Sequence, residues 1–168
     1  MSPTMSMSTT VSATPPAPAD GAMAGAHELL TISLAGELFG IEVVRVQEIL
    51  DIVPVTAVPN ADPFAPGVIN VRGHVVPLID LRHRFGLPPA PDGASGRTVV
   101  FEVQLEDERT RVAMTVDAVR DVLSVAPDRL EDIPEIGTRW NRAYVAGITR
   151  LDGELLIVLD AESVFAGF

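Results

Sequence analysis

The sequence predicts an all-β protein made of two similar small β units, and three observations lead to this fold class. Apolar and polar residues alternate over stretches of strand length, as at Leu30, Ile32 and Leu34. Glycine-containing turns separate pairs of apolar stretches, a pattern typical of β-hairpins. The two halves of the chain also match each other in pattern, which indicates an internal repeat. Because a sheet of about five strands hides its edges best by curling, each unit is expected to close into a barrel.

In the first half, periodic order begins near Glu28, and several strands are expected before a short helical turn. Arg72-Gly73 joins the last two of these strands as a hairpin turn. Residues 44–50 fit either a helical turn or a strand. The expected strands cover 28–34, 38–43, 67–71 and 75–79, and the helical turn covers 81–85.

The second half repeats this organisation. Alternating apolar residues predict strands at 99–105 and 112–116, with a turn at Asp107 between them. Two further apolar stretches, 145–151 and 154–159, meet at Asp152-Gly153, a pair of residues typical of tight hairpins. Trp140 and Tyr144 are expected to pack within this second unit. The alternative is that Trp140 and Tyr144 form part of a binding site.

The repeat consists of two matching blocks that occur in the same order in both halves. Residues 40–50 match residues 113–123, and within this block Glu48 corresponds to Asp121. Further on, four residues correspond in order: Gly67, Gly73, Asp80 and Phe85 match Gly147, Gly153, Asp160 and Phe165. Two ordered blocks favour a repeat over chance similarity between apolar strands.

The predicted organisation is a tail, two barrels and a linker between them. Residues 1–26 are rich in Ser, Thr, Ala, Pro and Met, with Asp20 as the only charged side chain, so they are expected to be disordered. The first barrel is expected at 27–88 and the second at 97–168. The stretch 89–96 contains several Pro and Gly residues and is expected to link them.

Composition and charge argue against several classes of function. The 168 residues carry a net charge of −11, whereas binding of nucleic acid needs clustered cations. All 12 basic residues are arginine, so a Walker A loop, a Schiff-base lysine and a kinase-type ATP lysine are excluded. Cysteine is absent as well, so nothing indicates an oxidising compartment. No apolar run has the length of a membrane span and no secretory signal is apparent, so a cytoplasmic location without membrane insertion is expected.

Few residues form a pattern that could carry catalysis or hold a cofactor. His74 and His83 lie near Asp80 in the sequence, but their spacing matches no metal-ligand motif. A small hydrolase that used Asp80 and His83 would need a positioned nucleophile, and the sequence shows none. We therefore expect no enzymatic activity, no metal and no other cofactor.

Arg72 is unusual because it occupies a hairpin turn, where its counterpart Asp152 suits the turn better. An arginine at such a position is either a solvated turn residue or a group that presents its planar guanidinium to a carboxylate or an interface. Physical reasoning from the residues leaves both interpretations open.

The stretch 67–82 contains an Asn-x-Arg-Gly turn at residues 70–73, followed by an apolar strand with Pro77. It resembles the signature of the CheW-like family. The central motif of that family is N-L-R-G, followed by an apolar strand that contains proline and ends in D-L. Here the motif reads Asn70-Val71-Arg72-Gly73 and ends at Asp80-Leu81. Further matches are Phe39-Gly40-Ile41, Val46-Gln47-Glu48-Ile49, residues 115–119 and Leu151-Asp152-Gly153. The resemblance covers about residues 28–165.

The resemblance implies two SH3-like five-stranded barrels and a non-catalytic scaffold for chemotaxis or a chemotaxis-like pathway. Its partners would be the regulatory domain of a CheA-type histidine kinase and the cytoplasmic tips of chemoreceptors. The protein would be a monomer alone and part of a multivalent array at the inner face of the membrane. The alternative is an SH3-like binding or structural protein without receptor or kinase partners, because a fold does not dictate its partners.

The resemblance also implies a partner-binding surface made of Val46, Glu48, Ile49, Arg72 and Gly73. Arg72 corresponds to the motif arginine implicated in receptor coupling, and Val46 and Glu48 flank the same surface. An arginine at a hairpin tip is costly to order unless a carboxylate holds it, so we expect Glu48 within salt-bridge reach of Arg72. An apolar groove between the barrels would take a receptor helix.

Overall fold

The computed structural model describes residues 26–90, 95–132 and 141–166. Of the predicted tail, only Ala26 belongs to the described residues, so the expected disorder of residues 1–26 concerns a segment outside them. Trp140 and the centre of the expected linker also lie outside the described residues.

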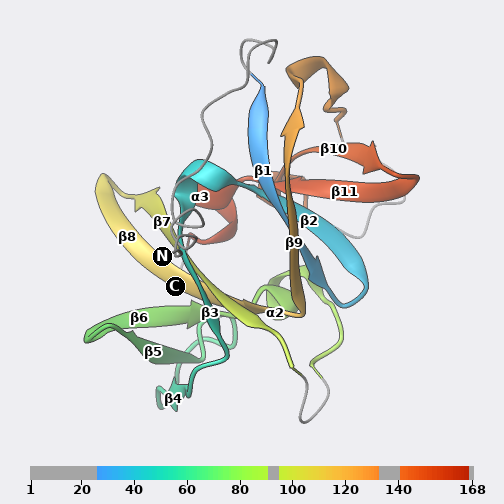
Figure 1. Cartoon of the computed structure of the whole chain (residues 1–168). Helices are drawn as coiled ribbons and strands as arrows, with labels where there is room; N and C mark the ends of the chain where they lie inside the picture. The colour runs from blue at the N-terminus through green and yellow to red at the C-terminus, as the bar shows by residue number, and fades with distance from the viewer. Residues whose placement is uncertain (1–25, 91–94, 133–140, 167–168) are drawn as a thin grey trace, which may run out of the picture.

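The described residues form strands and short helical segments in two strongly curled sheets, which confirms the all-β class (Figure 1). In chain order the strands are β1 (His27–Leu34), β2 (Glu37–Glu42), β3 (Val46–Asp51), β4 (Thr56–Ala57), β5 (Gly67–Val71), β6 (His74–Ile79), β7 (Arg97–Leu105), β8 (Glu108–Val116), β9 (Ala118–Val125), β10 (Val145–Leu151) and β11 (Glu154–Leu159). The helical segments are η2 (Val43–Arg45), α2 (Leu81–Phe85), η3 (Pro127–Arg129), η4 (Arg142–Tyr144) and α3 (Ala161–Val164). Residues 44–50, which fit either structure by pattern, are divided between η2 and β3.

The two sheets each combine strands from both halves of the chain. Sheet A has the order β10-β11-β2-β1-β9, and sheet B has the order β3-β7-β8-β6-β5-β4. The stretches predicted as separate barrels, 27–88 and 97–168, therefore do not coincide with the sheets. The chain crosses from sheet A to sheet B at η2 and returns between β8 and β9. The parallel pairs β2–β11 and β6–β8 complete the sheets, and such long-range pairing leaves no local signal in the sequence.

The predicted repeat is present as an exchange of strands between the halves. If β1, β2, β3, β5 and β6 are matched with β7, β8, β9, β10 and β11, the two sheets have the same strand order apart from the two-residue β4. The two hairpin turns are also equivalent, because φ is 52° at Arg72 and 50° at Asp152. Apart from β4, each half thus supplies two strands to one sheet and three to the other.

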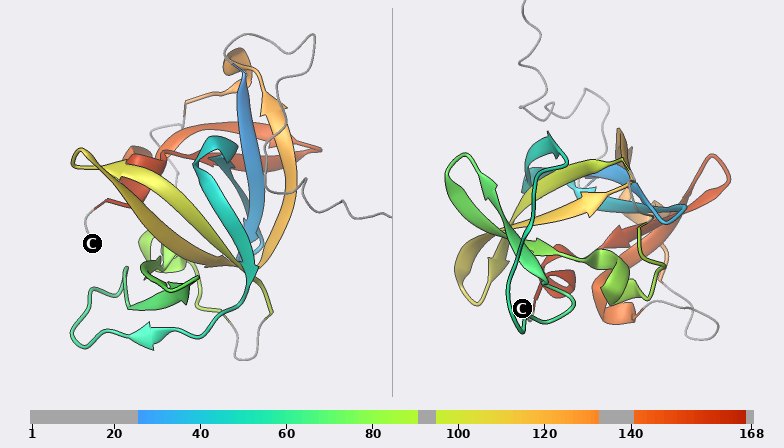
Figure 2. Two further views of the ribbon diagram at one scale, coloured as in Figure 1. Left: turned by 60° about the vertical axis from the view of Figure 1, so that its left-hand side comes forward. Right: turned by 90° about the horizontal axis from the view of Figure 1, so that it is seen from below.

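Each sheet closes into a small barrel because its two edges come together (Figure 2). We call the barrel formed by sheet A barrel A and the barrel formed by sheet B barrel B. In sheet B, residues 52–55 join the edge strands β3 and β4, and four residues span at most about 14 Å. In sheet A, the segment after β9 reaches the other edge at β10. There the N–H of Glu131 donates to the carbonyl of Ile148 at 2.8 Å, and the N–H of Ile148 donates back at 2.8 Å.

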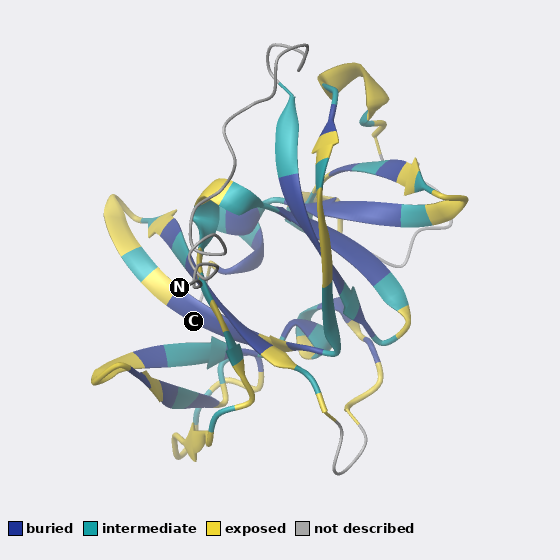
Figure 3. Cartoon of the chain, viewed as in Figure 1, coloured by how far each residue is buried: buried dark blue, intermediate teal, exposed yellow. Residues whose placement is uncertain are grey.

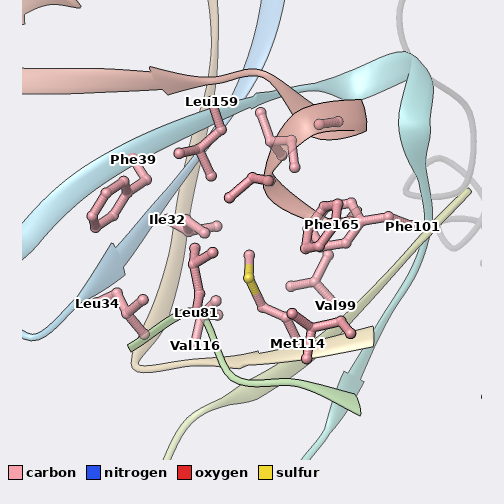
Figure 4. Close-up of a cluster of buried hydrophobic side chains, with 14 of the residues drawn as sticks. Ile32, Leu34, Phe39, Leu81, Val99, Phe101, Met114, Val116, Leu159 and Phe165 are labelled. Carbon is pink, nitrogen blue, oxygen red and sulfur yellow. The ribbon is translucent and has the colours of Figure 1, made fainter. Parts of the chain in front are cut away.

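The largest hydrophobic cluster lies between the two sheets and is shared by them (Figures 3 and 4). Phe101 of β7 stacks on Phe165, which follows α3, with 5.4 Å between the ring centroids. Phe39 of β2 contacts Phe85 of α2 at 5.4 Å. Two smaller clusters fill the barrels, one around Leu156 in sheet A and the other around residues of β5 to β8 in sheet B. Because the two barrels share this cluster, we expect them to unfold together.

Gly67 at the start of β5 allows β4 and β5 to pack closely, which gives a testable prediction. A Cβ atom at this position would lie 2.6 Å from the carbonyl oxygen of Thr56 and 2.8 Å from Cγ1 of Val55. Gly67→Ala is therefore expected to lower the free energy of unfolding by about 1–3 kcal/mol, the usual cost of overpacking. Gly40→Ala is the control, because the nearest atom would be Leu29 Cδ1 at 3.4 Å. Urea unfolding of both variants checks this, and equal losses would contradict it.

Candidate partner-binding site

The β5–β6 hairpin presents Arg72 at its tip in a strained backbone conformation. Val71 pairs with His74, so Arg72 and Gly73 form a two-residue turn. Arg72 has φ of 52° and Gly73 has φ of 84°. Gly73 suits this region because it has no Cβ, whereas a long side chain pays a steric cost there. The side-chain oxygen of Asn70 accepts a hydrogen bond from the N–H of Gly73 at 2.9 Å and fixes the turn.

The guanidinium of Arg72 is held by Glu48, as expected from the sequence. Its Nε donates to both carboxylate oxygens of Glu48, at 2.9 Å and 3.0 Å. The side chain of Arg72 is 75% exposed and that of Glu48 is 24% exposed. Within the described part of the chain, the two terminal nitrogens of Arg72 make no hydrogen bond. The ion pair therefore orients the guanidinium and leaves its outer edge available to a partner.

A β-bulge in β3 separates the predicted site residues between two faces of sheet B. Val46 pairs with Phe101, but Glu48 pairs with Val100, so two steps along β3 match one step along β7. Residues opposite each other in a ladder point to the same face. Val46 therefore lies on the face of the shared core, against which it packs, and Glu48 lies on the inner face of barrel B.

Ile49 lies on the same face as Val46, because it pairs with Val99 of the shared core. The family resemblance implied a single surface, but the structure divides its residues into two groups. Glu48, Arg72 and Gly73 lie at the mouth of barrel B, whereas Val46 and Ile49 lie on the opposite face of sheet B. Regular alternation along a strand would place Val46 and Glu48 on one face, and the bulge reverses that phase. The bulge leaves no signal in the sequence.

The apolar face of β3 has an equivalent on β9. Val119 packs against the shared core as Val46 does. Val122 is 43% exposed, and Ile49, its counterpart in the repeat, is 42% exposed. The edge strands β3 and β9 run on the same side of the molecule, facing the viewer in Figure 1. Both edges of the shared core therefore carry exposed aliphatic side chains.

Several other exposed aliphatic residues near β3 were missed by sequence reasoning. They lie before or after the strand and are largely exposed: Val44 (79% exposed), Ile52 (47%), Val55 (49%) and Val58 (42%). Pro54 and Pro59 flank Val55 and Val58, and proline is not tolerated inside a central strand. Proline within an apolar stretch was the available signal that these side chains remain on the surface.

Comparison with known proteins assigns the chain to a family. A profile of the CheW-like domain matches residues 28–167. The chain belongs to the CheW-like family. A probable chemotaxis protein CheW from Rhizobium etli is 33% identical over 142 residues, which are 84% of this chain and 89% of that protein. A chemotaxis protein CheW from Klebsiella aerogenes is 34% identical over 140 residues, 83% of this chain and 82% of that protein.

A solved structure agrees with this assignment. The crystal structure of the scaffolding protein TtCheW from Thermoanaerobacter tengcongensis has a TM-score of 0.73 and 29% identity, over 84% of this chain and 89% of that chain. As a member of the CheW-like family, the chain is a non-catalytic scaffold of chemotaxis.

In this CheW-like chain, the residues considered for a hydrolase have a structural role. Asp80 Oδ1 accepts a hydrogen bond from the backbone N–H of His83 at 3.2 Å and caps α2. Asp160 caps α3 in the same way through the N–H of Ser163, at 3.3 Å. In the described ranges, no group of three His, Cys, Asp or Glu side chains is placed to hold a metal. No helix among those residues is long and apolar enough to cross a membrane.

Proposed function

We propose that this protein couples chemoreceptors to a CheA-type histidine kinase by holding both in a fixed geometry. In this proposal it acts in the cytoplasm as a monomer recruited to receptor arrays at the inner face of the membrane. One surface binds the cytoplasmic tip of a chemoreceptor, and another binds the regulatory domain of the kinase. The pathway is chemotaxis, in keeping with the family.

The observation that carries the proposal is the presentation of Arg72. A residue in a left-handed turn position is retained at a cost when the site has a use for it. Arg72 is 75% exposed, is oriented by Glu48 and keeps its outer donors available. A guanidinium with that geometry suits a carboxylate on a partner protein.

The aliphatic residues on the exposed edges of the shared core support a helical partner. Val46 and Ile49 on β3, with Val119 and Val122 on β9, offer apolar contacts to the apolar face of an amphipathic helix. We propose that a receptor helix lies against these edges and that Arg72 contacts its polar side. Contacts with the kinase would be of modest area and reversible, and multivalency in an array would strengthen them.

Co-purification tests the proposal most simply. The protein is expected to retain both a CheA-type kinase and a chemoreceptor tip fragment, and to bring the two into one complex. A kinase and a receptor fragment that do not co-purify without the protein provide the control. Retention of neither partner would favour the alternative, an SH3-like binding or structural protein without receptor and kinase partners.

A further inference from the structure

The two barrels differ at their mouths although their strands are equivalent. In barrel B, the Arg72–Glu48 ion pair connects the hairpin tip to β3, and Leu50 packs on the inner cluster. In barrel A, the positions that correspond to Arg72 and Glu48 are occupied by Asp152 and Asp121. Two carboxylates repel each other and cannot form this connection. The mouth of barrel A therefore lacks the closure that barrel B has.

A pocket of about 370 Å³ lies at the mouth of barrel A. Its wall is formed by the end of β9, by η3 and by the β10–β11 hairpin. The pocket is lined by four aliphatic residues and two arginines, among others: Leu123, Val125, Leu151, Leu156, Arg129 and Arg150. On a chain with a net charge of −11, this pocket combines apolar and cationic groups. A ligand that carries an aliphatic or thioether side chain and a carboxylate could contact the apolar wall with the first group and the arginines with the second.

The N-terminal segment of the chain enters the fold at this pocket. Ala26 lines the pocket, and His27, the next residue, pairs with Val125 of β9. Asp20 is the only charged side chain among residues 1–25. Six residue-to-residue steps separate Asp20 from Ala26 and span at most about 20 Å, so the carboxylate of Asp20 is within reach of the pocket arginines. In the sequence, Met23 lies between Asp20 and Ala26, and its flexible thioether side chain adapts to irregular apolar surfaces.

We infer that residues 20–25 of this chain bind in the pocket of barrel A. Met23 lies against the aliphatic wall, and the carboxylate of Asp20 faces Arg129 and Arg150. The short connection to Ala26 gives an effective concentration on the order of millimolar, so weak contacts suffice to fill the pocket. A partner that docks on this mouth has to displace the segment.

The 168-residue chain allows a direct test, because it contains no cysteine. A nitroxide attached at Ala19→Cys broadens the NMR signals of nearby amides. We expect broadening of Leu123 and Leu151 that is several-fold stronger than that of Leu50 and Val71, the corresponding residues at the mouth of barrel B. Stronger broadening at barrel B would overturn the inference.

The tether alone keeps the nitroxide near Ala26, so variants within the segment decide the outcome. Asp20→Arg and Met23→Ser are each expected to reduce the broadening at the pocket several-fold, whereas Met7→Ser, outside the segment, is expected to leave it unchanged. Broadening that is the same in all three variants would show tethering without binding. A second sample mixes isotope-labelled chains without nitroxide with unlabelled chains that carry it. Pocket broadening in that sample would assign the pocket to a second copy and contradict binding within one chain.

Discussion

Arg72→Glu is expected to reduce receptor-dependent activation of the kinase at least about tenfold, which corresponds to about 1.4 kcal/mol of lost interaction. In the wild type, Nε of Arg72 lies 2.9 Å from the carboxylate of Glu48. The variant places a second carboxylate next to Glu48, which repels it, and removes the guanidinium donors offered to the receptor. The melting temperature is expected to fall by less than about 4 °C, because an exposed pair contributes only about 0–1 kcal/mol to folding. Kinase autophosphorylation with receptor membranes, measured beside thermal unfolding, gives both values.

Arg109→Glu is the matched control for this experiment. Arg109 is 77% exposed and lies 3.7 Å from Glu102, in an ion pair on a different hairpin. It should leave activation unchanged, because the proposed receptor surface does not include it. The exchange of Glu48→Arg with Arg72→Glu tests the pair as a pair and is expected to restore part of the activation. Normal coupling by Arg72→Glu would show that this interpretation of the motif is wrong.

Phe101→Ala is expected to lower the free energy of unfolding by about 3–5 kcal/mol, the usual range for a buried phenylalanine. Phe101 is 0% exposed and stacks on Phe165 in the cluster that both sheets share. A loss of this size is a large fraction of the stability of a domain, which is about 5–15 kcal/mol. Unfolding in urea, followed by far-UV circular dichroism, measures it.

Val75→Ala is the control for the core substitution. Val75 is 70% exposed on β6, so its truncation should change stability by no more than about 0.5 kcal/mol. Because the core is shared, Phe101→Ala should still unfold in one transition. Two separate transitions would show that the barrels fold independently, which contradicts a common core.

Most of the elements of this fold could be predicted from the sequence because their signals are local. Period-two alternation marked the strands, and Arg72-Gly73 and Asp152-Gly153 marked two hairpins that the structure contains. The matching blocks indicated two equivalent units. Which sheet each strand joins was predicted wrongly, because the parallel pairs β2–β11 and β6–β8 depend on contacts between distant segments. The residue pattern within one strand does not show which strand of the other half of the chain pairs with it.

The candidate site was predicted in part, for a similar reason. The Glu48–Arg72 pair could be predicted because a strained arginine needs a carboxylate and the family motif indicated which one. The placement of Val46 on the opposite face from Glu48 could not be, since the bulge in β3 appears only in the pairing with β7. The pocket of barrel A depends on side chains from β9, η3, β10 and β11, which come together only in the closed barrel.

The proposed coupling of receptors to a kinase predicts a direct effect of this protein on kinase activity in receptor membranes. Autophosphorylation of a CheA-type kinase is followed in membranes that contain chemoreceptors, with and without this protein, and with its Arg72→Glu variant. We predict that activity rises well above that of kinase alone only when the wild-type protein and the receptors are both present. Equal kinase activity with and without the protein, in the presence of receptors that a known coupling protein activates, would contradict the claim.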